Sequence, residues 1–269
     1  LLSSRAQRGT SSMGSLVVRL LGMTMYAMAL THSIIATLNT LRPLFAQHGG
    51  SLEIGSPYHV LVLVILSART RDEQVLKLAP GFFKAFPTVE RLAKADVAAV
   101  TAKVNTVGMY KQKAKNLSAM AKKVVTEFDG EVPRTLDELT SLAGVGRKTA
   151  SVILAALFGV PAIAVDTHVF RVTKRLGWTK GKTVERVEEE LRDTVPKKNW
   201  TDINRVFVPF GRAVCTPQPR CWSCPVRDMC AYPKKSLTPP PNADAIRATI
   251  LAKQEEFVRL KQDAVISLK

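Results

Sequence analysis

The chain has 269 residues, 46% of them hydrophobic, which is enough for one large domain or two smaller ones with a buried core. Lys and Arg outnumber Asp and Glu by 39 to 22, and the formal net charge of +17 favours a polyanionic partner, such as nucleic acid or anionic lipid. All four cysteines lie between Cys215 and Cys230. Cysteines so few and so clustered argue against a disulfide scaffold and favour a metal centre in a reducing compartment.

Residues 1–32 differ from the rest and are interpreted as a leader outside the folded body. Residues 1–50 contain four arginines and no acidic residue, and residues 20–41 carry no Asp, Glu, Lys or Arg. Such a stretch is typical of a signal peptide, a transit peptide or a membrane anchor. Interruptions by polar residues, among them Thr24, Thr31 and Asn39, weaken a membrane span, and we discount all three interpretations.

The remaining chain shows helical patterns. Apolar residues recur at helical spacing from Ser33 to Phe45, before a Gly49–Gly50 break. Tyr58 to Leu66 is almost wholly apolar, which fits a buried strand or a buried helix, and the lack of a partner strand favours helix. Further short helices are predicted over 88–93, 97–104, 114–128, 136–142, 148–158, 169–176, 184–194 and 204–212. The sequence therefore predicts an all-α fold with short connections.

A proline-rich linker follows Tyr232, and a further helix follows the linker. Asn242 is a candidate N-cap, and Ile246, Ile250 and Phe257 fall on one face. This appended helix could bind a partner, but we expect it to pack on the main body.

The segment LTSLAGVGRKTA (139–150) predicts a hairpin of two helices. The loop Gly144-Val145-Gly146 joins them, and Arg147 and Lys148 open the second helix. Glycines let a large ligand approach the backbone, and free N–H groups at a helix start bind phosphate. We therefore expect these residues to contact a nucleic-acid strand. The string alone is weak evidence, and by itself Lys148 would be an ordinary solvated lysine.

Asp166 follows a short apolar stretch and precedes another helical pattern. It is an obvious N-cap candidate, and a cap is the simpler interpretation. A carboxylate facing Lys148 across a groove would instead place a general base beside an amine nucleophile.

The cysteines Cys215, Cys221, Cys224 and Cys230 are separated by five, two and five residues. Four thiolates in one loop favour one metal centre, and both structural zinc and an iron–sulfur cluster fit the ligand count. Residues 197–235 carry eight basic and two acidic residues. This loop region is interpreted as a phosphate-contacting surface, with Arg220 and Arg227 as the leading contacts, although a solvated basic face would have the same composition.

Several motifs in order resemble the helix-hairpin-helix DNA glycosylase superfamily, specifically its endonuclease III branch. The resemblance spans roughly residues 35–232. It rests on LSARTRD (66–72), TVGMYKQKA (106–114), GEVP (130–133), LAGVGRKTA (142–150), AVDTHVFRV (164–172) and the cysteine loop.

The resemblance implies a bifunctional DNA glycosylase and abasic-site lyase that excises oxidised pyrimidines. Lys148 would attack the sugar C1′ and form a Schiff base, Asp166 would assist, and β-elimination would cut the strand on the 3′ side. The expected partner is double-stranded DNA with a damaged base or an abasic site. The protein is expected to act as a monomer and not to bind a membrane. The expected location is the cytoplasm or nucleoid, or the nucleus or mitochondrion of a eukaryote. The alternative is a non-catalytic, structure-specific DNA-binding protein.

The resemblance also implies a [4Fe–4S] cluster on the four cysteines and two wedge residues, Arg69 and Met109, that fill the gap left by an extruded nucleotide. Arg69 stands where the family usually has glutamine, so the choice of opposite base is open, and a plain phosphate contact is equally consistent with it. Core packing is the alternative for Met109. Ala143 replaces a common proline, Thr140 replaces an acidic residue, and the first cysteine spacing is one residue short.

The implied architecture is two helical domains with a DNA groove between them. A helical barrel with the hairpin would span 56–165. The cluster domain would combine 33–55 with 166–235, and 236–269 would form the linker and the appended helix.

Overall fold

The computed structural model describes residues 10–46, 52 and 54–268, and that part of the chain contains α-helices and 3-10 turns but no β-strand. The prediction of an all-α fold is confirmed. The helices are α1 (Thr10–Phe45), α2 (Pro57–Ser67), α3 (Asp72–Ala85), α4 (Val89–Ala93), α5 (Val97–Lys103), α6 (Tyr110–Glu127), α7 (Leu136–Thr140), α8 (Arg147–Phe158), α9 (Thr167–Leu176), α10 (Val184–Thr194), α11 (Trp200–Ala213) and α12 (Ala243–Ser267).

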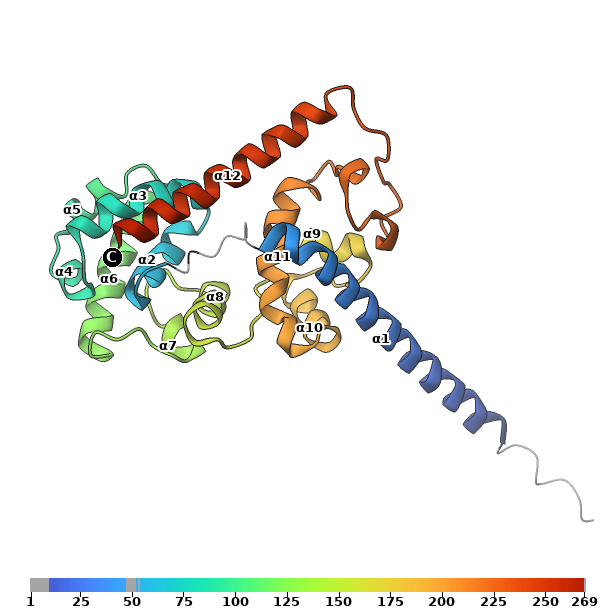
Figure 1. Ribbon diagram of the computed structural model, residues 1–269. Coiled ribbons are helices and arrows are strands. Elements are labelled where there is room, and N and C mark those ends of the chain that lie inside the picture. The colour runs from blue at the N-terminus through green and yellow to red at the C-terminus, as the bar shows by residue number, and fades with distance from the viewer. Residues whose placement is uncertain (1–9, 47–51, 53, 269) are drawn as a thin grey trace, which may run out of the picture.

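The buried apolar side chains form two separate hydrophobic cores. The first core gathers residues of α2 to α8 and two residues of α12. The second gathers the C-terminal part of α1, the helices α9, α10 and α11, and Val226 of the cysteine loop. Figure 1 shows these two groups side by side, with α8 of the first group facing α11 of the second. The two cores therefore define two halves of the molecule.

The apolar run at residues 58–66 forms helix α2 in the centre of the first core. Ser56 caps this helix, Pro57 occupies its first turn, and His59 completes a capping box by accepting from the backbone N–H of Ser56. Eight of its eleven residues are buried. A helix that is apolar on every side is stable only when neighbours surround it, and here α3, α6 and α8 do so.

Helix α3 was absent from the sequence prediction. It contains Pro80 followed by Gly81, a pair that normally breaks a helix. The helix nevertheless continues, because Val75, Ala79 and Phe82 fall on one face and are fully or almost fully buried in the first core. Tertiary burial thus outweighs the local breaker signal.

Helix α1 begins at Thr10, well before the pattern that starts near residue 33. The apolar residues that recur at helical spacing in this helix face the second core, where Ile34, Leu38 and Leu41 are fully buried. The start of the helix projects away from the body (Figure 1). Within the described residues, no helix is both long enough and apolar enough to cross a membrane. The predicted Gly49–Gly50 break lies outside the described residues.

Helix α12 connects the two halves on one side of the molecule (Figure 1). At its start the Arg247 guanidinium lies over the ring of the buried Trp222 in the cysteine loop, 5.1 Å from the ring centre. Further along, the helix packs on α3, where Phe257 is 5% exposed in the first core. The appended helix therefore packs on the body, as expected, although the Asn242 side chain makes no capping bond.

Candidate active site and cysteine loop

The predicted hairpin is present between α7 and α8. Gly144 has a φ of +83°, a conformation that favours glycine, and an added Cβ there would lie 2.9 Å from the Asn116 amide nitrogen and displace that side chain. Gly146 is the N-cap of α8 and faces open space. Val145 is 5% exposed, so its side chain belongs to the first core and only its backbone is available to a ligand. The loop therefore presents bare backbone at the start of a helix.

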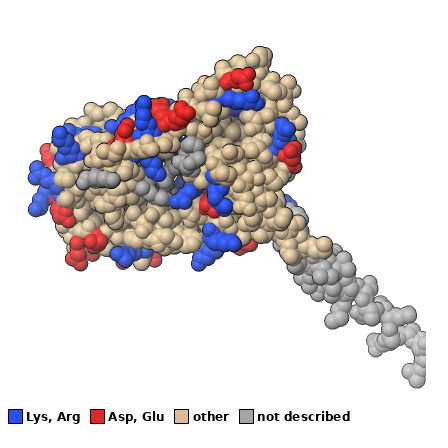
Figure 2. Space-filling view, viewed as in Figure 1, with Lys and Arg blue, Asp and Glu red and all other residues tan. Residues whose placement is uncertain are grey.

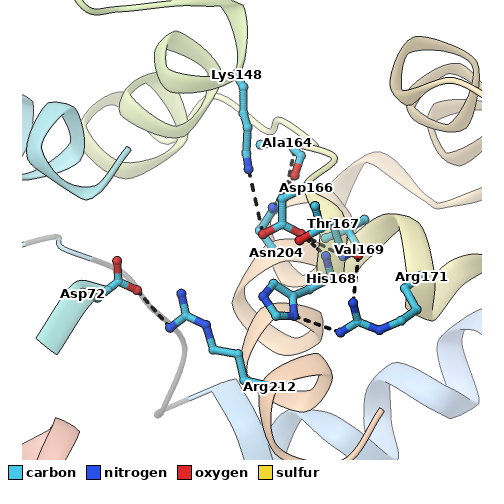
Figure 3. Close-up of polar contacts among 10 residues, drawn as sticks. All are labelled: Asp72, Lys148, Ala164, Asp166, Thr167, His168, Val169, Arg171, Asn204 and Arg212. Carbon is cyan, nitrogen blue, oxygen red and sulfur yellow. Dashed lines mark hydrogen bonds and ion pairs between the residues drawn. The ribbon is translucent and has the colours of Figure 1, made fainter. Parts of the chain in front are cut away.

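Lys148 and Asp166 face one another across the space between the two halves (Figure 3). Lys148 lies in the first turn of α8 with a half-exposed side chain, and its Nζ is 3.8 Å from Oδ2 of Asp166. Asp166 is the N-cap of α9, and its Oδ1 accepts from the backbone N–H groups of His168 and Val169 at 2.9 and 2.8 Å. One oxygen of Asp166 therefore caps the helix, and the other faces the lysine, which is the position that the general-base interpretation requires.

Asn204 of α11 fixes the segment that leads into Asp166, which the sequence prediction missed. Its Oδ1 accepts from the Ala164 N–H at 2.8 Å, and its Nδ2 donates to the Ala164 carbonyl at 2.5 Å. On either side of Ala164, Ile163 and Val165 are buried in the second core. Forty residues separate the partners, so no local pattern signals the contact.

An ion pair joins the two halves beside the site. Arg212 of α11 donates to Oδ2 of Asp72, the first residue of α3, at 3.1 Å (Figure 3). Asp72 is 7% exposed, and this burial raises the pKa of its carboxyl, while Arg212 opposes the shift and Asp166 adds to it. Burial also lowers the pKa of His168, which lies between Asp166 and Arg171. The site is therefore a compact set of charges supplied by both halves.

A cavity of about 430 Å³ opens at this place. Its volume lies within the roughly 300–1,000 Å³ typical of small-ligand sites. Both Lys148 and Asp166 line it, together with apolar residues of α2 and α8 and polar residues of α11. A single nucleotide extruded from a duplex could enter a cavity of this kind.

Arg69 and Met109 occupy two neighbouring turns near the cavity. Both have a left-handed backbone, with φ of 54° and 57°. Arg69 is exposed and lines the cavity, and Met109 is 55% exposed, which excludes core packing for its side chain. An added Cβ on Gly108 would lie 3.4 Å from the Arg69 carbonyl oxygen, so the two turns are in contact.

The four cysteines line one cavity at the second core. Helix α9 holds their loop: Arg171 donates to the Cys215 carbonyl at 2.8 Å, and Arg175 lies 3.5 Å from the Cys215 Sγ. Burial raises the pKa of the Cys224 thiol to about 11, and the neighbouring cysteines add to this rise. In the described residues, no three Cys, His, Asp or Glu side chains converge as ligands of a single metal ion.

The other three arginines predicted to contact DNA have different surroundings. Arg147 is exposed at the start of α8. Arg227 is half exposed and 3.8 Å from the carboxylate of Asp228. Arg220 donates to the Ala213 carbonyl, so its guanidinium holds the loop on α11. On the face in Figure 2, basic side chains are interspersed with acidic ones and do not form a surface of one sign.

Comparisons with known proteins give consistent results. Residues 62–197 match the family described as HhH-GPD superfamily base excision DNA repair protein. Endonuclease III of Thermotoga maritima is 42% identical over 177 residues, which is 65% of this chain and 83% of the relative. A solved trapped endonuclease III–DNA covalent intermediate is 35% identical with a TM-score of 0.70, covering 77% of this chain and 99% of its own. A non-covalent endonuclease III–DNA complex is also 35% identical, with a TM-score of 0.69, covering 74% of this chain and 94% of its own.

Proposed function

Since the chain belongs to the HhH-GPD superfamily of base excision DNA repair proteins, we propose that it is a bifunctional DNA glycosylase and abasic-site lyase with Lys148 as nucleophile. The observation that carries this proposal is the approach of Lys148 Nζ to within 3.8 Å of Asp166 Oδ2, at a cavity between the two halves. The resemblance to a trapped endonuclease III–DNA covalent intermediate supports it, because trapping requires a nucleophile on the protein.

In the proposed reaction the Lys148 amine acts first as the nucleophile that displaces the base and then as the imine nitrogen that promotes strand cleavage. The neutral Lys148 amine attacks C1′, so a C–N bond forms while the glycosidic bond breaks and the base leaves with its electron pair. Asp166 Oδ2 accepts the proton that the amine loses. The separation of 3.8 Å exceeds a hydrogen bond, so this transfer requires a small approach of the lysine or one bridging water. The released base takes up a proton from water. The sugar ring then opens: the C1′–O4′ bond breaks, O4′ takes up the proton that Asp166 returns, and a protonated C1′=N imine forms. This imine acidifies the C2′ proton. Water takes that proton, and the C3′–O bond breaks with its electron pair leaving on the 3′ phosphate, which cuts the strand.

A stacked nucleotide cannot reach Lys148, so the nucleotide must leave the duplex first. We assign the two wedges to Arg69, which is exposed and lines the cavity, and to Met109, which is exposed on the neighbouring turn. The hairpin loop, with Gly144 in a left-handed conformation and Gly146 open to solvent, would bind the phosphates of the damaged strand through its N–H groups.

We assign a [4Fe–4S] cluster to Cys215, Cys221, Cys224 and Cys230. All four line one cavity, and the positive charge of Arg175 lies beside Cys215, which suits a centre that binds thiolates. When bound, the cluster supplies a cross-link that stiffens the loop. A single zinc ion requires all four sulfurs within about 2.3 Å of one point. Among the described residues, no three metal-binding side chains gather as ligands of one ion. A broad absorbance band near about 400 nm with iron in the purified protein supports the cluster, whereas a colourless protein that holds zinc overturns it.

The proposed substrate is double-stranded DNA with an oxidised pyrimidine, bound by one copy of the chain. Duplexes that each hold one thymine glycol, one abasic site or one 8-oxoguanine test this preference. Thymine glycol should be released faster than 8-oxoguanine, and the reverse order would overturn the pyrimidine assignment. Varying the base opposite the lesion then measures what Arg69 contributes to opposite-base choice.

Borohydride trapping on abasic DNA tests the nucleophile. Borohydride reduces the imine to a stable amine and thereby fixes the protein to the DNA. The Lys148→Gln variant should yield no adduct, whereas Lys122→Gln, which removes an exposed lysine of α6, should match the parent. If Lys148→Gln forms the adduct as well as the parent does, the nucleophile is another group and the proposal fails.

A further inference from the structure

Lys113 of α6 is a buried lysine that the proposed chemistry does not use. It is 5% exposed, and burial lowers the pKa of its ammonium. The described part of the chain contains no acidic side chain paired with it. A buried cation without a carboxylate requires another source of stabilisation.

Two oxygen atoms of the Arg69 turn supply that stabilisation. The Lys113 Nζ donates to the Leu66 carbonyl at 2.7 Å and to the Thr70 Oγ1 at 2.6 Å. The Leu66 carbonyl belongs to the last turn of α2, where carbonyl groups lack helical partners and the helix dipole favours a cation. These two acceptors lie on either side of Arg69, so the ammonium spans the turn.

Lys113 is also linked to the other wedge. Its backbone N–H donates to the Met109 carbonyl at 3.0 Å, in the first turn of α6. Arg69 and Met109 both have left-handed backbones, which residues other than glycine adopt only when their surroundings impose them. A Cβ added to Gly108 would lie 3.4 Å from the Arg69 carbonyl oxygen, so the turn that holds Met109 packs beside the Arg69 turn. A contact that ties the Arg69 turn to α6 therefore helps to set how the two wedge side chains lie relative to one another.

We propose that Lys113 is a positioning residue for nucleotide extrusion: its ammonium ties the Arg69 turn to the start of α6, so that both wedge side chains enter the duplex from one rigid unit. This inference rests on the wedge assignment of the proposed function. Lys113 contacts no substrate in this scheme and acts only through Arg69 and Met109.

The test compares duplex DNA with single-stranded DNA, each holding one abasic site. Rates of borohydride-trapped adduct are measured in single turnovers at saturating enzyme. Single strands have no stack to open, so they need no wedge. We expect Lys113→Met to slow trapping at least tenfold on the duplex and less than twofold on the single strand. Lys115→Met, which removes an exposed lysine two residues further along α6, should change both rates less than twofold.

A spectroscopic measurement monitors extrusion directly. 2-Aminopurine placed opposite the abasic site brightens when a wedge unstacks it, and Lys113→Met should lose most of this rise. Thr70→Val removes the shorter of the two Lys113 Nζ contacts and should cause a smaller loss of trapping rate, again on the duplex only. This variant tests the positioning role if Lys113→Met does not fold.

The outcomes separate this inference from the proposed function. Equal losses on duplex and single strand, or parental rates on both, overturn the positioning role of Lys113. Arg69→Ala and Met109→Ala are measured in parallel. If both retain the duplex rate and the 2-aminopurine signal, the wedge assignment itself is wrong. If Arg69→Ala and Met109→Ala lose the duplex rate and the 2-aminopurine signal while Lys113→Met and Thr70→Val keep both, only the role of Lys113 is wrong.

Discussion

Replacing Asp166 by asparagine separates the two tasks of its carboxylate. Oδ1 accepts the capping bonds of His168 and Val169 at 2.9 and 2.8 Å, while Oδ2 lies 3.8 Å from Lys148 Nζ. Asparagine and aspartate are equally good N-caps, so the amide oxygen should preserve the start of α9. An amide, however, does not take up a proton from the lysine amine. The substitution therefore removes the base and keeps the cap.

The expected magnitudes follow from these two roles. Loss of a positioned general base slows a reaction by roughly 10²- to 10⁴-fold, which is about 3–5 kcal/mol of activation free energy. The thermal midpoint of Asp166→Asn should stay close to that of the parent. Asp166→Ala loses the cap as well, at about 1 kcal/mol, and its midpoint should fall by about 2–4 °C. The two variants should thus share a kinetic defect and differ in stability.

The assay pairs single-turnover release of thymine glycol with thermal melting followed by circular dichroism. Binding to abasic duplex DNA serves as the control, because neither variant should lose it. An Asp166→Asn variant with the parental rate would reduce Asp166 to a helix cap. Equal loss of stability in both variants would show that charge, rather than the oxygen acceptor, maintains the start of α9.

Three further substitutions test contacts outside the nucleophile. Arg212→Met strands the buried carboxylate of Asp72 and should lower the free energy of unfolding by about 1–3 kcal/mol, a loss that the added Asp72→Asn should partly reverse in urea titrations. Burial lowers the pKa of His59 from its usual 6.5, so the stability from its capping bond is present above pH 6.5 and is lost as the pH falls through the lowered pKa. His59→Gln should therefore melt with a smaller pH dependence between about pH 7.5 and 5, and an unchanged slope would contradict this. Phe257→Ala should cost about 3–5 kcal/mol if α12 completes the first core, whereas Leu251→Ala, at an exposed position of the same helix, should cost little in the same titration.

The sequence alone determined the features that depend on neighbouring residues. The helix over the apolar run at 58–66 begins where Ser56 caps it and Pro57 occupies its first turn, and Gly144 permits the left-handed turn of the hairpin. Asp166 caps α9 because its carboxylate reaches N–H groups two and three residues further along. The clustering of the cysteines predicted one metal centre, and the structure places all four along one cavity.

The tertiary structure decided the contacts between distant segments. Asp72 and Arg212 are 140 residues apart and pair only because the two cores bring α3 and α11 together. Helix α3 itself continues through Pro80 because burial in the first core outweighs the local preference to break. Nothing in the local sequence distinguishes Lys113 from the other basic residues of the chain. Its ammonium is buried only because α6 packs on the end of α2. Local spacing specifies helices and caps, whereas the free energy of burying two cores fixes which charged groups meet.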